Sequence, residues 1–193
     1  FAESADDSAE NVERKIVNTG KAIDHLKIGH EFKHAIANNE LVLYYQPILE
    51  PDNHKIRGFE ALMRWNHPVK GFMPPNLFIP IAEDSGLIVA ASDWAMEEAC
   101  NALQDMKAQC PALGQDAFMS INFTAIDMLH PDFLNKLLAV CEKTGVKPSN
   151  LKIEMTERLL MNNPEKVQSM LRACKEAGFK IAIDDFGTGY SSL

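Results

Sequence analysis

The sequence predicts an α/β fold in which parallel strands curl into a barrel, and two observations support this prediction. Segments with strand-like and helix-like apolar periodicity alternate along most of the chain, as they do in βαβ units. Each predicted strand also carries a polar residue near its end, on the face opposite its apolar side chains. A barrel reconciles the two observations, because its outer face packs against helices while its inner face gathers polar groups at one rim.

Turn and cap signals separate the elements in order. Residues 28–36 show an apolar helical face that ends at Asn38. Pro74 opens the next helix, and Gly145 and Gly178 close later ones. Between these signals the predicted strands are residues 41–47, 56–65, 117–123, 151–156 and 179–184. The predicted helices after the first are residues 74–86, 94–106, 131–143 and 164–176.

A polar lead precedes the domain. Within residues 1–26, apolar or near-apolar positions are spaced four and three residues apart, at Val12, Ile16, Thr19, Ile23 and Leu26. This heptad-like spacing predicts a linker or signalling helix, and both pairing with a partner chain and local packing fit it. We expect residues 27–193 to be the N-terminal and central part of a barrel domain that is truncated at its C-terminal side.

The composition is that of a folded globular chain with an acidic balance. The 193 residues are 46% hydrophobic and carry a formal net charge of −8 at pH 7. This charge disfavours duplex nucleic acid as a partner, so an anionic ligand would need metal ions or local arginines. No run approaches the ~20 apolar residues of a membrane span. The four widely spaced cysteines are typical of reduced thiols in a cytosolic domain.

The polar residues on the predicted strands indicate a metal site. Four strands carry an oxygen donor at equivalent positions: Glu60, Asn122, Glu154 and Asp184. Carboxylates gathered inside a barrel need a cation, because like charges at close range otherwise force protonation. An all-oxygen donor set favours Mg²⁺ or Mn²⁺, with Ca²⁺ as an inhibitory substitute. The alternative is that these residues only end strands or cap helices.

The neighbours of these donors predict chemistry at phosphorus. Asp185 follows Asp184 and could reach a second ion, and two ions a few ångströms apart are a recurrent device for displacement at phosphorus. Arg64 lies on the same strand face as Glu60, where its guanidinium would hold a phosphate oxygen. The sequence therefore predicts cleavage of a phosphodiester.

A series of short motifs extends this prediction. They are Glu60-Ala61-Leu62 within residues 59–65, Tyr-Gln-Pro-Ile at 45–48, Ser-Ile-Asn at 120–122, Ile-Glu-Met-Thr-Glu at 153–157, and the segment 184–193 that begins Asp-Asp-Phe-Gly. In this order, from about residue 27 onward, the chain resembles EAL domains, the bacterial phosphodiesterases that act on cyclic di-GMP. The resemblance implies a modified (βα)8 TIM-like barrel whose first strand runs antiparallel to the rest.

The same resemblance implies roles for individual residues. The implied metal ligands are Glu60, Asn122, Glu154, Asp184 and Asp185, the last also serving the attacking water. Gln46, Leu62 and Arg64 would contact the dinucleotide. Glu157 would steady the loop 185–192, so the implied catalytic residues are Glu60, Asp185 and Glu157. The implied reaction is attack of water on one phosphodiester of cyclic di-GMP, which releases linear pGpG.

Family members carry a catalytic lysine, a further glutamate and a late glutamine after the Asp-Asp-Phe-Gly loop, beyond the last residue here, Leu193. We therefore expect the 193 residues alone to be inactive and assign the activity to the intact domain. The implied partners are cyclic di-GMP, a second copy in a homodimer, and an upstream sensory or GGDEF-like domain. The implied location is a cytoplasmic domain, which is compatible with a membrane-anchored parent protein.

Three alternatives stay open at this point. A catalytically inactive EAL module would bind cyclic di-GMP or another protein as a receptor or scaffold. The segment His30-Glu31-Phe32-Lys33-His34 fits the zinc-protease pattern H-E-x-x-H, but the longer metzincin pattern fails at Ala37 and Glu40. The triplet 185–187 matches the kinase metal-binding motif, yet no glycine-rich loop or His-Arg-Asp accompanies it.

Overall fold

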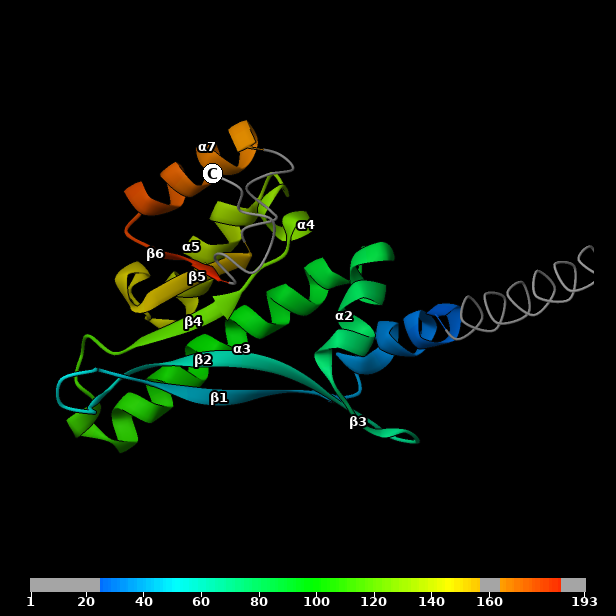
Figure 1. The fold of residues 1–193 in the computed structure, drawn as a ribbon, viewed down its shortest axis with the longest axis horizontal. Coiled ribbons are helices and arrows are strands. Elements are labelled where there is room, and N and C mark those ends of the chain that lie inside the picture. The colour runs from blue at the N-terminus through cyan, green and yellow to red at the C-terminus, as the bar shows by residue number, and fades with distance from the viewer. Residues whose placement is uncertain (1–24, 157–163, 185–193) are drawn as a thin grey trace, which may run out of the picture.

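The computed structural model describes residues 25–156 and 164–184, and it confirms the alternation of strands and helices (Figure 1). The strands are β1 (Leu41–Leu49), β2 (Ile56–His67), β3 (Gly71–Met73), β4 (Phe118–Asn122), β5 (Leu151–Thr156) and β6 (Lys180–Asp184). A helix over residues 25–35 comes first. The later helices are α2 (Pro75–Asp84), α3 (Ile88–Gln109), α4 (Ala125–Met128), α5 (Phe133–Thr144) and α7 (Pro164–Glu176), with 3-10 turns η1 (Pro111–Leu113) and η2 (Pro148–Asn150).

All described strands belong to one mixed sheet. Its order is β1-β2-β4-β5-β6, with β3 paired to β2 outside this path. Strand β1 runs antiparallel to β2, whereas β2, β4, β5 and β6 are mutually parallel. The carboxyl ends of the four parallel strands therefore meet at one edge of the sheet. The antiparallel first strand and the parallel strands that follow confirm the expected α/β, TIM-like architecture.

Helices cover the face of the sheet that carries odd-numbered side chains. Met119, Ile121, Ile153 and Met155 are almost fully buried there, against apolar residues of α3, α5 and α7. Figure 1 shows α3 running along β2 and β4, with α5 and α7 beyond it. Burial of this apolar surface stabilises the fold and leaves the even-numbered side chains on the opposite face.

A second core cluster joins the first helix to the start of the sheet. The rings of Phe32, Trp65 and Phe78 pack against one another with centroids 5.2–5.7 Å apart. The indole N–H of Trp65 donates to Oε2 of Glu40 at 2.9 Å, so the buried ring keeps a hydrogen-bond partner. This cluster anchors residues 25–35 beside β2.

Gly58 allows β2 and β4 to approach each other closely. A Cβ atom at this position would lie 2.4 Å from the carbonyl oxygen of Phe118 and 2.9 Å from its ring. The absence of a side chain therefore lets the Phe118 ring lie across the sheet, where the ammonium groups of Lys152 and Lys180 face it at 4.5 and 4.7 Å.

The structure also contains elements that the periodicity does not predict. Strand β3 has three residues and α4 has four, and segments this short show no measurable period. The predicted lead helix and its heptad-like positions up to Ile23 lie outside the described residues. Within the described ranges, the helices are too short or too polar to cross a membrane.

Candidate functional site

The predicted ligand positions lie on adjacent parallel strands, on the face away from the helices. Asn122 of β4 is the register partner of Glu154 of β5, and Glu60 of β2 pairs with Ser120, two residues before Asn122 along β4. Asp184 is the last residue of β6. The backbone thus brings the four positions to neighbouring strands. Asn122 and Asp184 end their strands and Glu154 lies two residues from the end of β5, whereas Glu60 is the fifth of twelve residues of β2, within the segment that pairs with β4.

Two of these side chains are in direct contact. The amide nitrogen of Asn122 donates a hydrogen bond to Oε1 of Glu60 at 2.8 Å. This bond leaves the amide oxygen of Asn122 and the second carboxylate oxygen of Glu60 as acceptors for a further partner. The next residue is also fixed, because the Phe123 N–H donates to the carbonyl of Glu154 at 2.9 Å. The strand end that presents Asn122 is therefore tied to both of its neighbours.

The third described donor, Glu154, is close to a lysine. Its residue is 9% exposed, and Nζ of Lys152 lies 3.5 Å from its Oε1. At this distance the ion pair is long, so the carboxylate keeps capacity for another partner. Between the two carboxylate-bearing strands, the hydroxyl of Ser120 is fully buried and has no hydrogen-bond partner among the described residues. A buried orphan hydroxyl here fits a site that binds further polar groups.

The predicted substrate contacts lie on the neighbouring strands of the same face. Gln46 of β1 is the register partner of Glu60, and Leu62 pairs with Tyr44. The guanidinium of Arg64 donates to the carbonyl of the preceding residue at 2.8 Å and lies 5.6 Å from the centre of the Tyr44 ring. Within the described part of the chain its other N–H groups form no further hydrogen bond, so they could donate to an anion, and Tyr44 is exposed beside it.

With this geometry in place, comparison with known families identifies the chain. The sequence matches the family model of the EAL domain over residues 30–193. The chain belongs to the EAL domain family.

Two relatives and one solved structure describe the similarity. The bifunctional diguanylate cyclase/cyclic di-GMP phosphodiesterase MucR of Pseudomonas aeruginosa is 34% identical over 172 residues, 89% of this chain and 25% of that protein. The probable cyclic di-GMP phosphodiesterase PdeG of Escherichia coli is 38% identical over 161 residues, 83% and 31% respectively. The EAL enzyme Bd1971, solved with cAMP and cyclic di-GMP bound, superposes with a TM-score of 0.84 at 37% identity over 94% of this chain and 49% of that one.

These proteins are longer than this chain, which spans between a fifth and a third of the length of the curated relatives it matches. The family and its fold are therefore established for this EAL domain.

Part of the predicted EAL site lies outside the described residues. Asp185 and Glu157, predicted to be catalytic, both fall there. Asp184 is described only by its backbone, as the register partner of Thr156. Of the predicted ligand side chains, the structure thus shows those of Glu60 and Asn122 in contact, and that of Glu154 on the next strand.

The donors that are described fit a hard divalent cation. Carboxylate and amide oxygens dominate this edge, which are the ligands that Mg²⁺ and Mn²⁺ prefer. Within residues 25–156 and 164–183, no three His, Cys, Asp or Glu side chains gather into a potential metal site. The described donors alone are therefore a partial set, which consists of the amide of Asn122 and the carboxylates of Glu60 and Glu154.

The zinc-protease pattern has a structural explanation in this EAL domain. Glu31, its would-be general base, forms an ion pair with Lys70, and Nε2 of His67 lies 3.1 Å from its carboxylate. The bond with Lys70 is the main reason why the pKa of Glu31 is lowered. The rings of His30 and His34 lie 5.6 Å apart on the exposed side of the helix. The kinase-like triplet at 185–187 lies outside the described residues.

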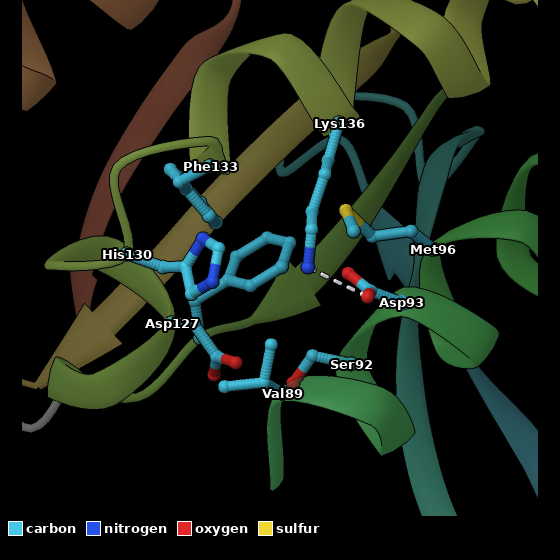
Figure 2. Close-up of a pocket in the computed structure, with 9 residues that line it drawn as sticks. Val89, Ser92, Asp93, Met96, Asp127, His130, Phe133 and Lys136 are labelled. Atoms are coloured by element: carbon cyan, nitrogen blue, oxygen red, sulfur yellow. Dashed lines mark hydrogen bonds and ion pairs between the residues drawn. The ribbon is translucent and has the colours of Figure 1, made fainter.

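One buried carboxylate escaped the sequence reasoning. Asp127 of α4 lines a small cavity between α3, α4 and α5, together with Ser92, His130 and the ion-paired Lys136 (Figure 2). Asp127 is 3% exposed, and burial raises the pKa of its carboxyl. A signal was present, because Thr-x-x-Asp ahead of an apolar residue is a helix-capping pattern.

Proposed function

We propose that the intact domain hydrolyses one phosphodiester bond of cyclic di-GMP, releases linear pGpG, and uses Mg²⁺ or Mn²⁺. The observation that carries this proposal is the 2.8 Å hydrogen bond between Asn122 and Glu60, which joins the EAL signature to the next predicted ligand. The names of MucR and PdeG support the substrate and the reaction, since both are cyclic di-GMP phosphodiesterases by name. The structure of Bd1971 with cyclic di-GMP bound supports the ligand.

The proposed metal ligands are the oxygen donors of the four parallel strands, Glu60, Asn122, Glu154 and Asp184, with Asp185 beside them. When bound, one or two divalent ions would acidify the attacking water and offset the charge that develops on the phosphate. The Asn122–Glu60 hydrogen bond orients one carboxylate oxygen before any cation binds. Such pre-orientation lowers the cost of assembling the site.

The substrate would lie over β1 and β2, next to these donors. Arg64 is held by its bond to the Met63 carbonyl and by the Tyr44 ring, so its guanidinium is positioned to donate to a phosphate oxygen. Gln46 is exposed on the same face opposite Glu60, where its amide could hydrogen-bond the dinucleotide. Leu62, half-buried between them, would supply an apolar contact.

Further parts of the proposal concern segments that the structure does not describe. We assign Glu157 the role of steadying the loop 185–192, which would couple the metal site to contacts between two copies of the domain. An upstream sensory or GGDEF-like domain would adjust this coupling through the lead segment. The 193 residues alone would be inactive, because the family's catalytic lysine and further glutamate follow the Asp-Asp-Phe-Gly loop.

The parent protein, supplied with Mg²⁺ or Mn²⁺ and cyclic di-GMP, tests the proposal by chromatography of the products. The wild type is expected to release pGpG, and chelation of the metal should abolish this release. Glu60→Gln keeps the size of the side chain and removes its charge, so hydrolysis should be lost while nucleotide binding, measured by calorimetry, persists. Glu142→Gln, on the exposed face of α5, is the matched control and should hydrolyse like the wild type.

A parent protein that binds cyclic di-GMP without any turnover, in the presence of either metal, would overturn the enzyme proposal. That result would favour the inactive receptor instead. If neither binding nor turnover is detected, the domain would act as a protein-interaction scaffold.

A further inference from the structure

The short helix α4, which follows β4, contains a buried carboxylate that the proposed chemistry does not use. Oδ2 of Asp127 accepts the backbone N–H of Thr124 at 2.9 Å and its hydroxyl at 2.8 Å. In return, the Thr124 hydroxyl accepts the N–H of Asp127 at 3.4 Å. The two residues form a reciprocal capping box at the start of α4.

The burial of the Asp127 carboxylate destabilises the fold more than capping a helix of four residues would justify. Asp127 is 3% exposed, and by geometry its second oxygen, Oδ1, accepts no hydrogen bond from the described residues, although the Ser92 hydroxyl lies close enough to lower the pKa of the carboxyl. Figure 2 shows the carboxylate directed toward Val89 and Ser92 of α3. A buried and half-satisfied carboxylate costs free energy, so its presence needs an explanation beyond one helical turn.

The capping box acts on the backbone that immediately follows a predicted metal ligand. Thr124 is two residues after Asn122, and the intervening residue is held twice. Its N–H donates to the carbonyl of Glu154, and the Phe123 ring packs edge-on against Phe133 with centroids 5.0 Å apart. Asp127 adds the next constraint along the chain, because it fixes the Thr124 N–H.

The side chain of Asn122 has little packing of its own. The residue is exposed, and its described side-chain contact is the hydrogen bond to Glu60. Its direction therefore depends on the backbone around it. Residues that lock this backbone control whether the amide meets Glu60, much as outer partners orient the ligands of metal sites.

We infer that Asp127 is a positioning residue that holds Asn122 against Glu60 through Thr124 and the turn after β4. The inference deepens the proposed function, on which its consequence for metal binding rests. Asp127 itself touches neither metal nor substrate. Loss of its acceptor oxygen should weaken the binding of the divalent ion by roughly 10–100-fold, the usual effect of removing an outer partner of a metal ligand.

The test is titration of the metal-free parent protein with Mn²⁺ in the absence of nucleotide, followed by electron paramagnetic resonance. Asp127→Ala and Thr124→Val should each raise the dissociation constant by roughly 10–100-fold. Asp127→Asn and Thr124→Ser keep the acceptor and the hydroxyl, so both should restore most of the affinity. Phe78→Leu, in the separate core cluster, is the control for general loss of stability.

Hydrogen exchange of the peptide over residues 118–130 gives a second readout that needs no metal. Exchange should accelerate in Asp127→Ala and Thr124→Val, and stay near the wild-type rate in Phe78→Leu. Faster exchange with unchanged Mn²⁺ affinity would overturn the inference, because Asp127 would then be only structural. Wild-type protein that binds Mn²⁺ but hydrolyses nothing would contradict the proposed function alone. Wild-type protein that binds no Mn²⁺ would contradict both.

Discussion

The amide of Asn122 donates to the carboxylate of Glu60 at 2.8 Å across 62 residues of sequence. The bond joins β4 to β2, which are neighbours in the sheet although β3, α2, α3 and η1 separate them along the chain. It pairs a neutral donor with an acidic acceptor. Because several carboxylates lie on this face of the sheet, a neutral donor can hold Oε1 of Glu60 in place without adding another negative charge.

Replacing Asn122 with Asp should make the fold more dependent on metal. The change removes the donor and places a second carboxylate beside Glu60. The free energy of unfolding of the metal-free protein should fall by roughly 1.5–3 kcal/mol, the range for a hydrogen bond to a charged group. Added Mn²⁺ should offset the repulsion, so its effect on Tm should exceed that in the wild type. Differential scanning fluorimetry with EDTA or Mn²⁺ measures both, with Asn101→Asp on the exposed side of α3 as control. An equal metal effect in both variants would contradict the prediction.

The close contact at Gly58 gives a prediction for stability. A methyl group there would meet the Phe118 carbonyl at 2.4 Å, and backbone atoms cannot move aside cheaply. Gly58→Ala should therefore destabilise the protein by roughly 1–3 kcal/mol in urea denaturation. Gly29→Ala is the matched control, since this helical position has its nearest neighbour, Ile81, at 3.4 Å. The free energy of unfolding of Gly29→Ala should stay unchanged or rise by up to about 1 kcal/mol, because alanine has the higher helix propensity. Similar losses in both variants would contradict the argument.

Much of the fold could be predicted from the sequence because the strand pattern is unambiguous. In β4 and β5, Ile121 and Ile153 face the helices while Asn122 and Glu154 face away, so the period of two assigns both faces. The antiparallel direction of β1 is not encoded in any local sequence pattern. Its prediction rests on the resemblance to EAL domains.

The missed elements were those whose signal is weak or non-local. Strand β3 exists because Met73 pairs with Trp65 of β2, and a three-residue strand has no periodicity to detect. Asp127 was missed because an Asp in a loop is usually solvated, and only tertiary packing buries it. The sequence could predict that Glu60 and Asn122 lie close together. It could not predict the hydrogen bond between them, because that bond depends on the side-chain rotamers.

The cysteines differ in reactivity because they differ in exposure. Burial raises the pKa of Cys100 to about 12 and those of Cys141 and Cys174 to about 11, whereas Cys110 is exposed. A thiol reacts as its thiolate, so the three buried residues should be inert in the native protein. A disulfide-exchange reagent should modify one thiol rapidly in native protein of this chain and four after denaturation. Cys110→Ser should remove the rapid reaction, and rapid modification that persists in this variant would contradict the assignment.

The buried carboxyl of Asp127 should make stability depend on pH. Burial raises its pKa above the ordinary 3.8, and hydrogen bonding from Thr124 and from the Ser92 hydroxyl opposes this only in part. Nearby Asp93 raises it further, although Asp93 is ion-paired with Lys136 at 2.7 Å. The native state therefore binds the proton more tightly than the unfolded chain. Stability contributed by this group is present below pH 3.8 and is lost as pH rises toward the raised pKa.

Asp127→Asn isolates this effect, because it removes the titration and keeps an acceptor for Thr124. Urea denaturation of both proteins between about pH 4 and pH 8 gives the difference in unfolding free energy. The stability of the wild type relative to the variant should fall as pH rises and level off above the raised pKa. His130, Asp93 and Lys136, which line the same cavity, are present in both proteins. A relative stability that rises with pH would mean a lowered pKa, and thus a carboxylate stabilised by its partners more than it is destabilised by burial.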